Sequence, residues 1–190
     1  GVIMAGATLR ITRPLTNAFV DGTFEVRGSV TVDENPPPQR VIIDKVEVQF
    51  GENTPKLPAE TTNDWKTWKR SGSPPNGTRD GQSIKITAFV TAHVVPNGGP
   101  LSIPPVSVVV KLDTTKPNIT IDDYESDVTP PSLPYHVTLS GTAQDLGSGV
   151  SNVRYQLGDA APLAADNPLG NWSRWEKTFD LPADEHLIQF

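Results

Sequence analysis

The chain has 190 residues, with 16 basic and 22 acidic side chains, a formal net charge of −6 and no cysteine. The absence of cysteine excludes a disulfide scaffold, a thiolate metal site and a cysteine nucleophile. The acidic balance argues against a nucleic-acid partner, because such a protein would cluster Lys and Arg. The 19 prolines and 15 glycines disfavour long helices, since each interior proline costs a helix about 3 kcal/mol. Composition therefore favours an all-β fold.

Short runs of alternating apolar and polar residues predict strands in the first part of the chain, since such runs place one face on a core and the other in water. Turn-forming clusters of Pro, Gly, Asn and Asp separate them. Five or more strands in about 105 residues is the spacing of a β-sandwich. The predicted strands include Thr8–Ile11, Phe24–Val32, Lys45–Phe50, Ser83–Ala88 and Val106–Leu112.

A second set of strand patterns follows the segment Asp113–Pro117. We therefore predict two domains, residues 5–112 and 117–190, joined by a linker at residues 113–117. The predicted strands of the second domain are Asn118–Asp122, Tyr135–Ala143, Ser151–Leu157, Trp175–Phe179 and His186–Phe190.

The two parts of the chain are internal repeats of one module. Two aligned pairs share an offset of 107 residues, and one of them places two tryptophans in register. A third pair aligns at an offset of 113, which indicates loop insertions of a few residues. The aligned pairs are Val46–Glu52 with Val153–Asp159, Trp65–Lys69 with Trp172–Glu176, and Phe24–Ser29 with Val137–Thr142.

Several motifs of the second repeat resemble the bacterial immunoglobulin-like repeats of large surface and secreted proteins. They are Asp-Thr-Thr-x-Pro at 113–117, Ile-Thr-Ile at 119–121, Leu-Ser-Gly-Thr-Ala-x-Asp at 139–145, Gly-Ser-Gly-Val at 147–150, and Trp175 followed by Phe-x-Leu-Pro at 179–182. The first repeat departs from this pattern: residues 76–80 interrupt it where a strand is expected after Trp68. These motifs specify a scaffold and no activity.

The resemblance implies an all-β fold of two immunoglobulin-like Greek-key β-sandwiches in tandem. The second sandwich is expected to lack its last strand, because Val106–Leu112 of the first repeat has no counterpart before Phe190. We therefore expect the sequence to be part of a longer polypeptide. The alternative is that another chain donates the missing strand.

The sequence holds no Walker loop, no Gly-x-Gly-x-x-Gly fingerprint, no His-Glu-x-x-His and no Gly-x-Ser-x-Gly elbow. The three histidines, His93, His136 and His186, fall in or beside separate predicted strands. We expect no catalytic constellation and no organic cofactor within these residues.

Acidic residues near the predicted junction are candidates for a cation site, since Ca²⁺ takes six to eight oxygen ligands. The resemblance implies calcium at the interdomain junction, with Asp113, Asp122, Asp123 and Asp145 as its ligands. The other interpretation is that these carboxylates are exposed and keep a loop solvated.

The four tryptophans occur as two pairs, and the members of each pair are three positions apart. On an extended strand, Trp65 and Trp68 would face opposite sides, and so would Trp172 and Trp175. An outward tryptophan could stack on a sugar ring or fill a pocket of a protein partner. Filling of the core explains the same residues without a ligand.

The sequence therefore predicts a non-catalytic spacer, adhesion or binding module of a larger bacterial surface or secreted protein, with a protein or carbohydrate ligand. The alternative function is a set of N-terminal accessory domains in a secreted hydrolase or oxidoreductase whose catalytic domain lies beyond residue 190. Variable loops at residues 35–40 and 54–63 would present the contact surface. No apolar run reaches the roughly 20 residues that span a bilayer, so direct membrane insertion is not expected, and the N-terminus lacks a signal-peptide pattern.

Overall fold

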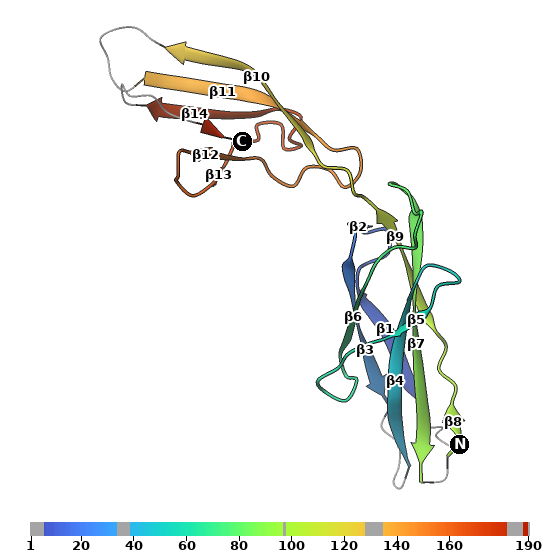
Figure 1. Cartoon of the computed structure of the whole chain (residues 1–190). Helices are drawn as coiled ribbons and strands as arrows, with labels where there is room; N and C mark the ends of the chain where they lie inside the picture. Colours follow the sequence, from blue (N-terminus) through green and yellow to red (C-terminus); the bar gives the residue numbers. More distant parts are fainter. Residues whose placement is uncertain (1–5, 34–38, 97, 128–134, 182–187, 190) are drawn as a thin grey trace. The chain divides into compact units, whose positions relative to one another are not determined.

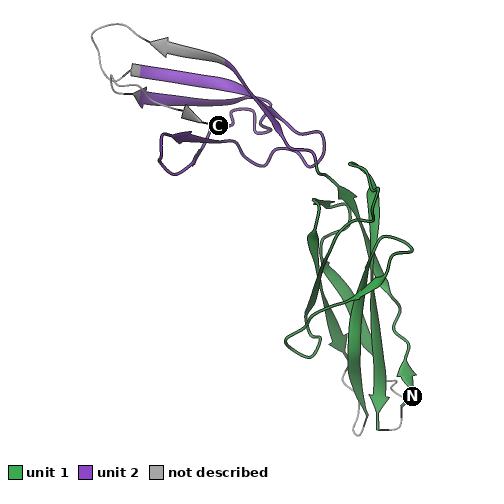
Figure 2. Cartoon of the chain, viewed as in Figure 1, with its two compact units in different colours: residues 1–114 green, residues 115–190 purple. Residues whose placement is uncertain are grey.

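A computed structural model describes residues 6–33, 39–96, 98–127, 135–181 and 188–189 of the chain. All regular elements in these ranges are β-strands, which confirms the predicted all-β class (Figure 1). In the same ranges, no helix is long and apolar enough to cross a membrane. The chain divides into two compact units, residues 1–114 and 115–190 (Figure 2).

Unit 1 is a sandwich of two sheets. The first sheet has the order β1-β3-β6, and the second has the order β2-β9-β7-β4-β5, with β8 paired to β7. The strands are β1 (Ala7–Arg13), β2 (Phe19–Val20), β3 (Phe24–Val32), β4 (Arg40–Phe50), β5 (Lys56–Pro58), β6 (Trp68–Gly72), β7 (Ser83–Val95), β8 (Pro100–Leu101) and β9 (Val106–Leu112).

The chain of unit 1 crosses between its sheets in the Greek-key manner of an immunoglobulin-like fold. It passes from β3 to β4, returns from β5 to β6, and crosses again to β7. Among its described strands, all pairings are antiparallel except that of β2 with β9, which is parallel. The predicted immunoglobulin-like sandwich is confirmed for this unit.

The alternation of apolar and polar residues explains which face of each strand is buried. On β3, Val26 and Val30 are 0% and 5% exposed, whereas Arg27 between them points to solvent. The same period on β4 and β7 supplies the facing half of the core. The buried cluster consists of Leu9, Val20, Val26, Val30, Val46, Val48, Phe50, Trp68, Ile84, Ile86, Ala88, Val110 and Leu112.

Unit 2 repeats this plan with sheets ordered β10-β11-β14 and β13-β12-β15. Its smaller core contains Ala143, Val153, Tyr155, Ala165, Trp175 and Phe179. The strands are β10 (Asn118–Asp127), β11 (Tyr135–Gln144), β12 (Arg154–Leu157), β13 (Leu163–Ala164), β14 (Trp175–Leu181) and β15 (Ile188–Gln189).

The register between β1 and β3 in unit 1 matches the register between β10 and β11 in unit 2. Ile11 lies opposite Gly28 in unit 1, and Ile121 lies opposite Gly141 in unit 2. In both units the register shifts immediately after this pair, so that Arg13 and Asp123 resume the pairing. The two units therefore share one sheet geometry down to the position of a β-bulge.

The described part of unit 2 contains no strand in the position that β9 occupies in unit 1. Leu9 on β1 is 3% exposed in the core that β9 helps to form, whereas its counterpart Ile119 is 40% exposed and Ile121 is 56% exposed. The inner face of β10 is thus only partly covered by the described residues.

Two details differ from the sequence-based expectation. The strand β6 does follow Trp68, so the predicted interruption by residues 76–80 is wrong: that segment is the loop after β6. The predicted loop at residues 54–63 contains the strand β5, which pairs with β4. Residues 35–38 of the other predicted loop lie outside the described part.

Candidate functional site

The second tryptophan of each pair is a core residue held against a glycine. Trp68 and Trp175 are 2% and 0% exposed. A Cβ atom added to Gly28 would lie 2.1 Å from Cζ2 of Trp68, and one added to Gly141 would lie 2.7 Å from Cζ2 of Trp175. Both distances are shorter than any real carbon contact, so each indole ring packs where only glycine leaves room.

The first tryptophan of each pair sits in a turn before the strand, not on the strand itself. Trp65 and Trp172 have φ angles of 67° and 60°, which lie in the left-handed region. Their carbonyl oxygens accept hydrogen bonds from the backbone N–H groups of Val30 (3.2 Å) and Ala143 (3.1 Å). The turn is therefore fixed to the first sheet in both units.

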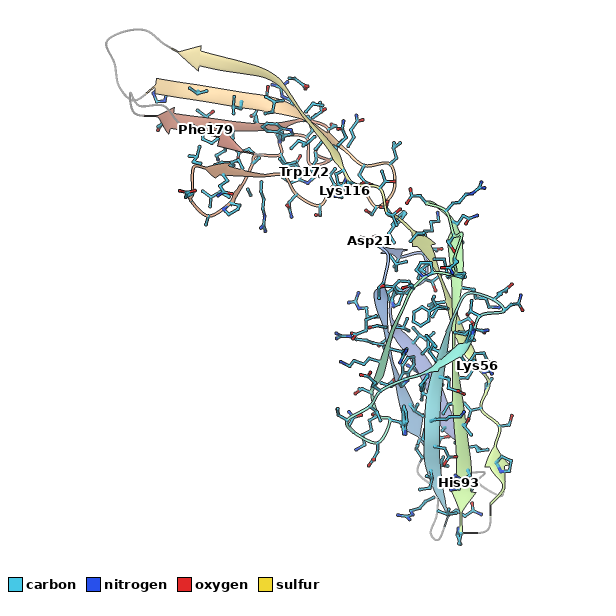
Figure 3. The ribbon with its side chains drawn as sticks, viewed as in Figure 1. Asp21, Lys56, His93, Lys116, Trp172 and Phe179 are labelled. Carbon is cyan, nitrogen blue, oxygen red and sulfur yellow. The ribbon has the colours of Figure 1, made fainter. Side chains whose placement is uncertain are left out.

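This geometry corrects the expectation that each pair would face opposite sides of a strand. Trp65 and Trp172 are both partly buried and pack against the core of their own unit. The indole N–H of Trp172 donates to the carbonyl of Ser151 at 3.2 Å, and Trp172 lies near the beginning of β14 (Figure 3). Trp68 and Trp175 are buried and Trp65 and Trp172 are partly buried, so all four rings contribute to the core of their own unit.

The two largest of the hollows described on unit 1 lie beside the tryptophans. The first, of about 780 Å³, lies on the first sheet and is lined mainly by polar residues, among them Thr12, Arg27 and Lys69. The second, of about 660 Å³, is lined by Val32, Ile42 and other residues beside Trp65. Neither holds a nucleophile next to a general base, which is the arrangement that nucleophilic catalysis needs.

The predicted calcium ligands are divided between the units. Asp113 is 7% exposed and belongs to unit 1. Asp145 caps its own loop: Oδ1 accepts hydrogen bonds from the backbone N–H groups of Gly147 (2.8 Å) and Gly149 (3.1 Å), while Oδ2 is buried without a partner.

The other two predicted ligands lie on β10. The carboxylate of Asp122 accepts a hydrogen bond from Thr120 Oγ1 at 2.7 Å, and the side chain of Asp123 is outside the described part. Among the described residues, no group of three or more potential metal ligands comes together. Calcium binding by Asp113, Asp122, Asp123 and Asp145 therefore stays a prediction.

The two described histidines each face a carboxylate across neighbouring strands. His93 Nδ1 lies 3.0 Å from Asp44, and His136 Nδ1 lies 2.6 Å from Asp180. All four side chains are at least 40% exposed, and His93 and His136 belong to different units. These are surface pairs, and ion pairs at such exposure contribute little to stability. His186 lies outside the described residues.

No protein-family model matches the chain, and no curated protein matches it. Among solved structures, the chain is similar to one described as the fibronectin(III)-like modules of CbhA from Clostridium thermocellum. The TM-score is 0.48 and the sequence identity is 18%, over 95% of this chain and 83% of that chain. The fold itself follows from the strand order and register of the two units.

Proposed function

We propose that this chain is a non-catalytic accessory tandem of immunoglobulin-like modules in a larger secreted protein, where it supports an enzymatic domain. The observation that carries the proposal is the repeated pairing of Gly28 with Trp68 and of Gly141 with Trp175. The same contact between a glycine and a buried tryptophan thus stabilises the core of both units. A catalytic role would instead call for titratable side chains gathered in one concave site.

A spacer or adhesion module is the second candidate. Tandem repetition favours it, since each unit has a core of its own, and further copies of the module would extend the reach of a surface protein. The loops would then present the contact surface to a protein or carbohydrate ligand. Both candidates place the chain outside a bacterial cell, as the resemblance of its motifs implies.

The experiment compares the natural protein with a variant that lacks residues 1–190. We expect turnover of a small soluble substrate to be unchanged, and thermal stability or activity on a polymeric substrate to fall. The isolated chain is assayed beside them for hydrolase and oxidase activity. Turnover by the isolated chain that persists through purification would contradict the proposal. Loss of cell attachment, with no catalytic activity in the natural protein, would select the spacer or adhesion role.

A further inference from the structure

Each unit presents one long strand at the open edge of its first sheet. Among the described strands, β1 pairs only with β3, and β10 pairs only with β11. An edge strand carries unpaired backbone N–H and C=O groups, which form a template for another strand. These two edges are equivalent in the two units, because they share register and bulge.

The two edges carry opposite charge. β1 contains Arg10 and Arg13 and no acidic residue, whereas β10 contains Asp122, Asp123, Glu125 and Asp127 and no basic residue. The net charges of the two units differ in the same direction. Residues 1–114 hold twelve basic and eleven acidic side chains, which gives a net charge of +1. Residues 115–190 hold four basic and eleven acidic side chains, which gives a net charge of −7.

The positive charge near β1 is not fully neutralised within unit 1. Arg13 lies opposite Arg27, which in turn lies opposite Lys69, and like charges in directly opposed positions destabilise a sheet. Glu25 forms ion pairs with both Arg27 and Lys69. Among the described residues, Arg10 and Arg13 are exposed and make no ion pair. They remain available to an acidic partner.

The acidic edge also exposes apolar surface. Ile119 and Ile121 on β10 are 40% and 56% exposed, and Asp122 next to them is exposed as well. A partner strand that carries basic residues would match the charge of this edge. β1 carries Arg10 and Arg13, which are both exposed, whereas its Leu9 is buried in the core of unit 1.

We propose that β1 of one copy of the chain pairs antiparallel with β10 of a second copy. The two three-stranded sheets then form one continuous sheet, with the arginines of β1 beside the acidic residues of β10. Like charges repel each other when β1 pairs with a second β1 or β10 with a second β10. The charges therefore favour pairing of β1 with β10. Because the two surfaces differ, the contact is head-to-tail and can propagate into short filaments. This goes beyond the proposed function and does not depend on it.

The test is sedimentation equilibrium of the chain at about 0.01 M and about 1 M salt, where the Debye length is about 30 Å and about 3 Å. We expect self-association at low salt and its loss at high salt. R10E/R13E and D122R/D123R should each weaken association roughly tenfold. The combination of all four substitutions brings opposite charges together again at these positions, while Glu125 and Asp127 keep their charge, and it should recover part of the association.

Two further variants separate charge from folding. R79E/K111E makes the same change in net charge as R10E/R13E at exposed positions outside β1, and it should leave association unchanged. R10K/R13K conserves the charge and should retain association. A monomer at every concentration at low salt would overturn the proposal. So would equal weakening by R79E/K111E, or a fourfold variant that folds and associates no better than R10E/R13E.

Discussion

The substitution G28A tests how tightly the first sheet closes on Trp68. The added Cβ would lie 2.1 Å from Cζ2 of Trp68 and 2.2 Å from the carbonyl oxygen of Arg10. Both neighbours must retreat by about 1 Å, and neither can do so freely, because Trp68 is 2% exposed and Arg10 belongs to a paired strand. Overpacking of this kind costs about 1–3 kcal/mol, and we expect the upper end of that range.

Urea unfolding followed by tryptophan fluorescence measures this loss. The matched control is G99A, since a Cβ at Gly99 would meet no atom within 4 Å; its stability should stay within about 0.5 kcal/mol of the wild type. G141A is the counterpart in unit 2, with a Cβ 1.9 Å from the carbonyl oxygen of Thr120. A loss below about 1 kcal/mol for G28A would refute the reasoning, because the glycine would then not be required for packing.

Three further predictions concern the core, a loop and the cation site. W68A and W175A should each cost about 3–5 kcal/mol in urea unfolding, and a loss under about 1 kcal/mol would contradict burial of the ring. D80A removes the acceptor of the Thr114 N–H (2.6 Å) and hydroxyl (3.2 Å) and should cost about 1 kcal/mol, whereas D80N should cost less. Calorimetric titration with calcium should give a binding heat that D145N reduces; absence of any heat contradicts calcium binding.

Two predicted strands agree with the structure to the residue: one alternates apolar and polar residues, and the other is a mostly apolar run that contains Ser107 and Lys111. Phe24–Val32 and Val106–Leu112 match β3 and β9. β4 begins five residues before the predicted Lys45, because a bulge at Asp44 places two exposed residues in succession and breaks the period of two. Alternation of apolar and polar residues predicts the bounds of a strand only where no bulge interrupts its pairing.

The tryptophan turn could not be derived from spacing alone. Three positions on a strand place two side chains on opposite faces, but the positive φ angles of Trp65 and Trp172 return both rings to the core side. A signal was present in Asn63 and Asp64, since Asn and Asp favour turns and tolerate left-handed conformations. In the structure, the side chain of Asn63 accepts a hydrogen bond from the N–H of Thr67 across this turn.

The charge relation between β1 and β10 became visible only with the strand order. The sequence shows two arginines in one segment and four acidic residues in another, 109 positions after Arg13 at the nearest. Sheet order places both segments at equivalent free edges. Local sequence patterns do not show which strands lie at the edge of a sheet, because strand order depends on how the whole chain folds.

The most direct test of the accessory role is the intact mass of the natural protein, together with the gene sequence that encodes it. We predict a mass well above the 20.5 kDa of this chain and a recognisable catalytic domain in the same polypeptide. A longer run of similar repeats without a catalytic domain would contradict the enzymatic role and favour a spacer or adhesin. A mass of 20.5 kDa would contradict both the accessory role and the spacer or adhesion role.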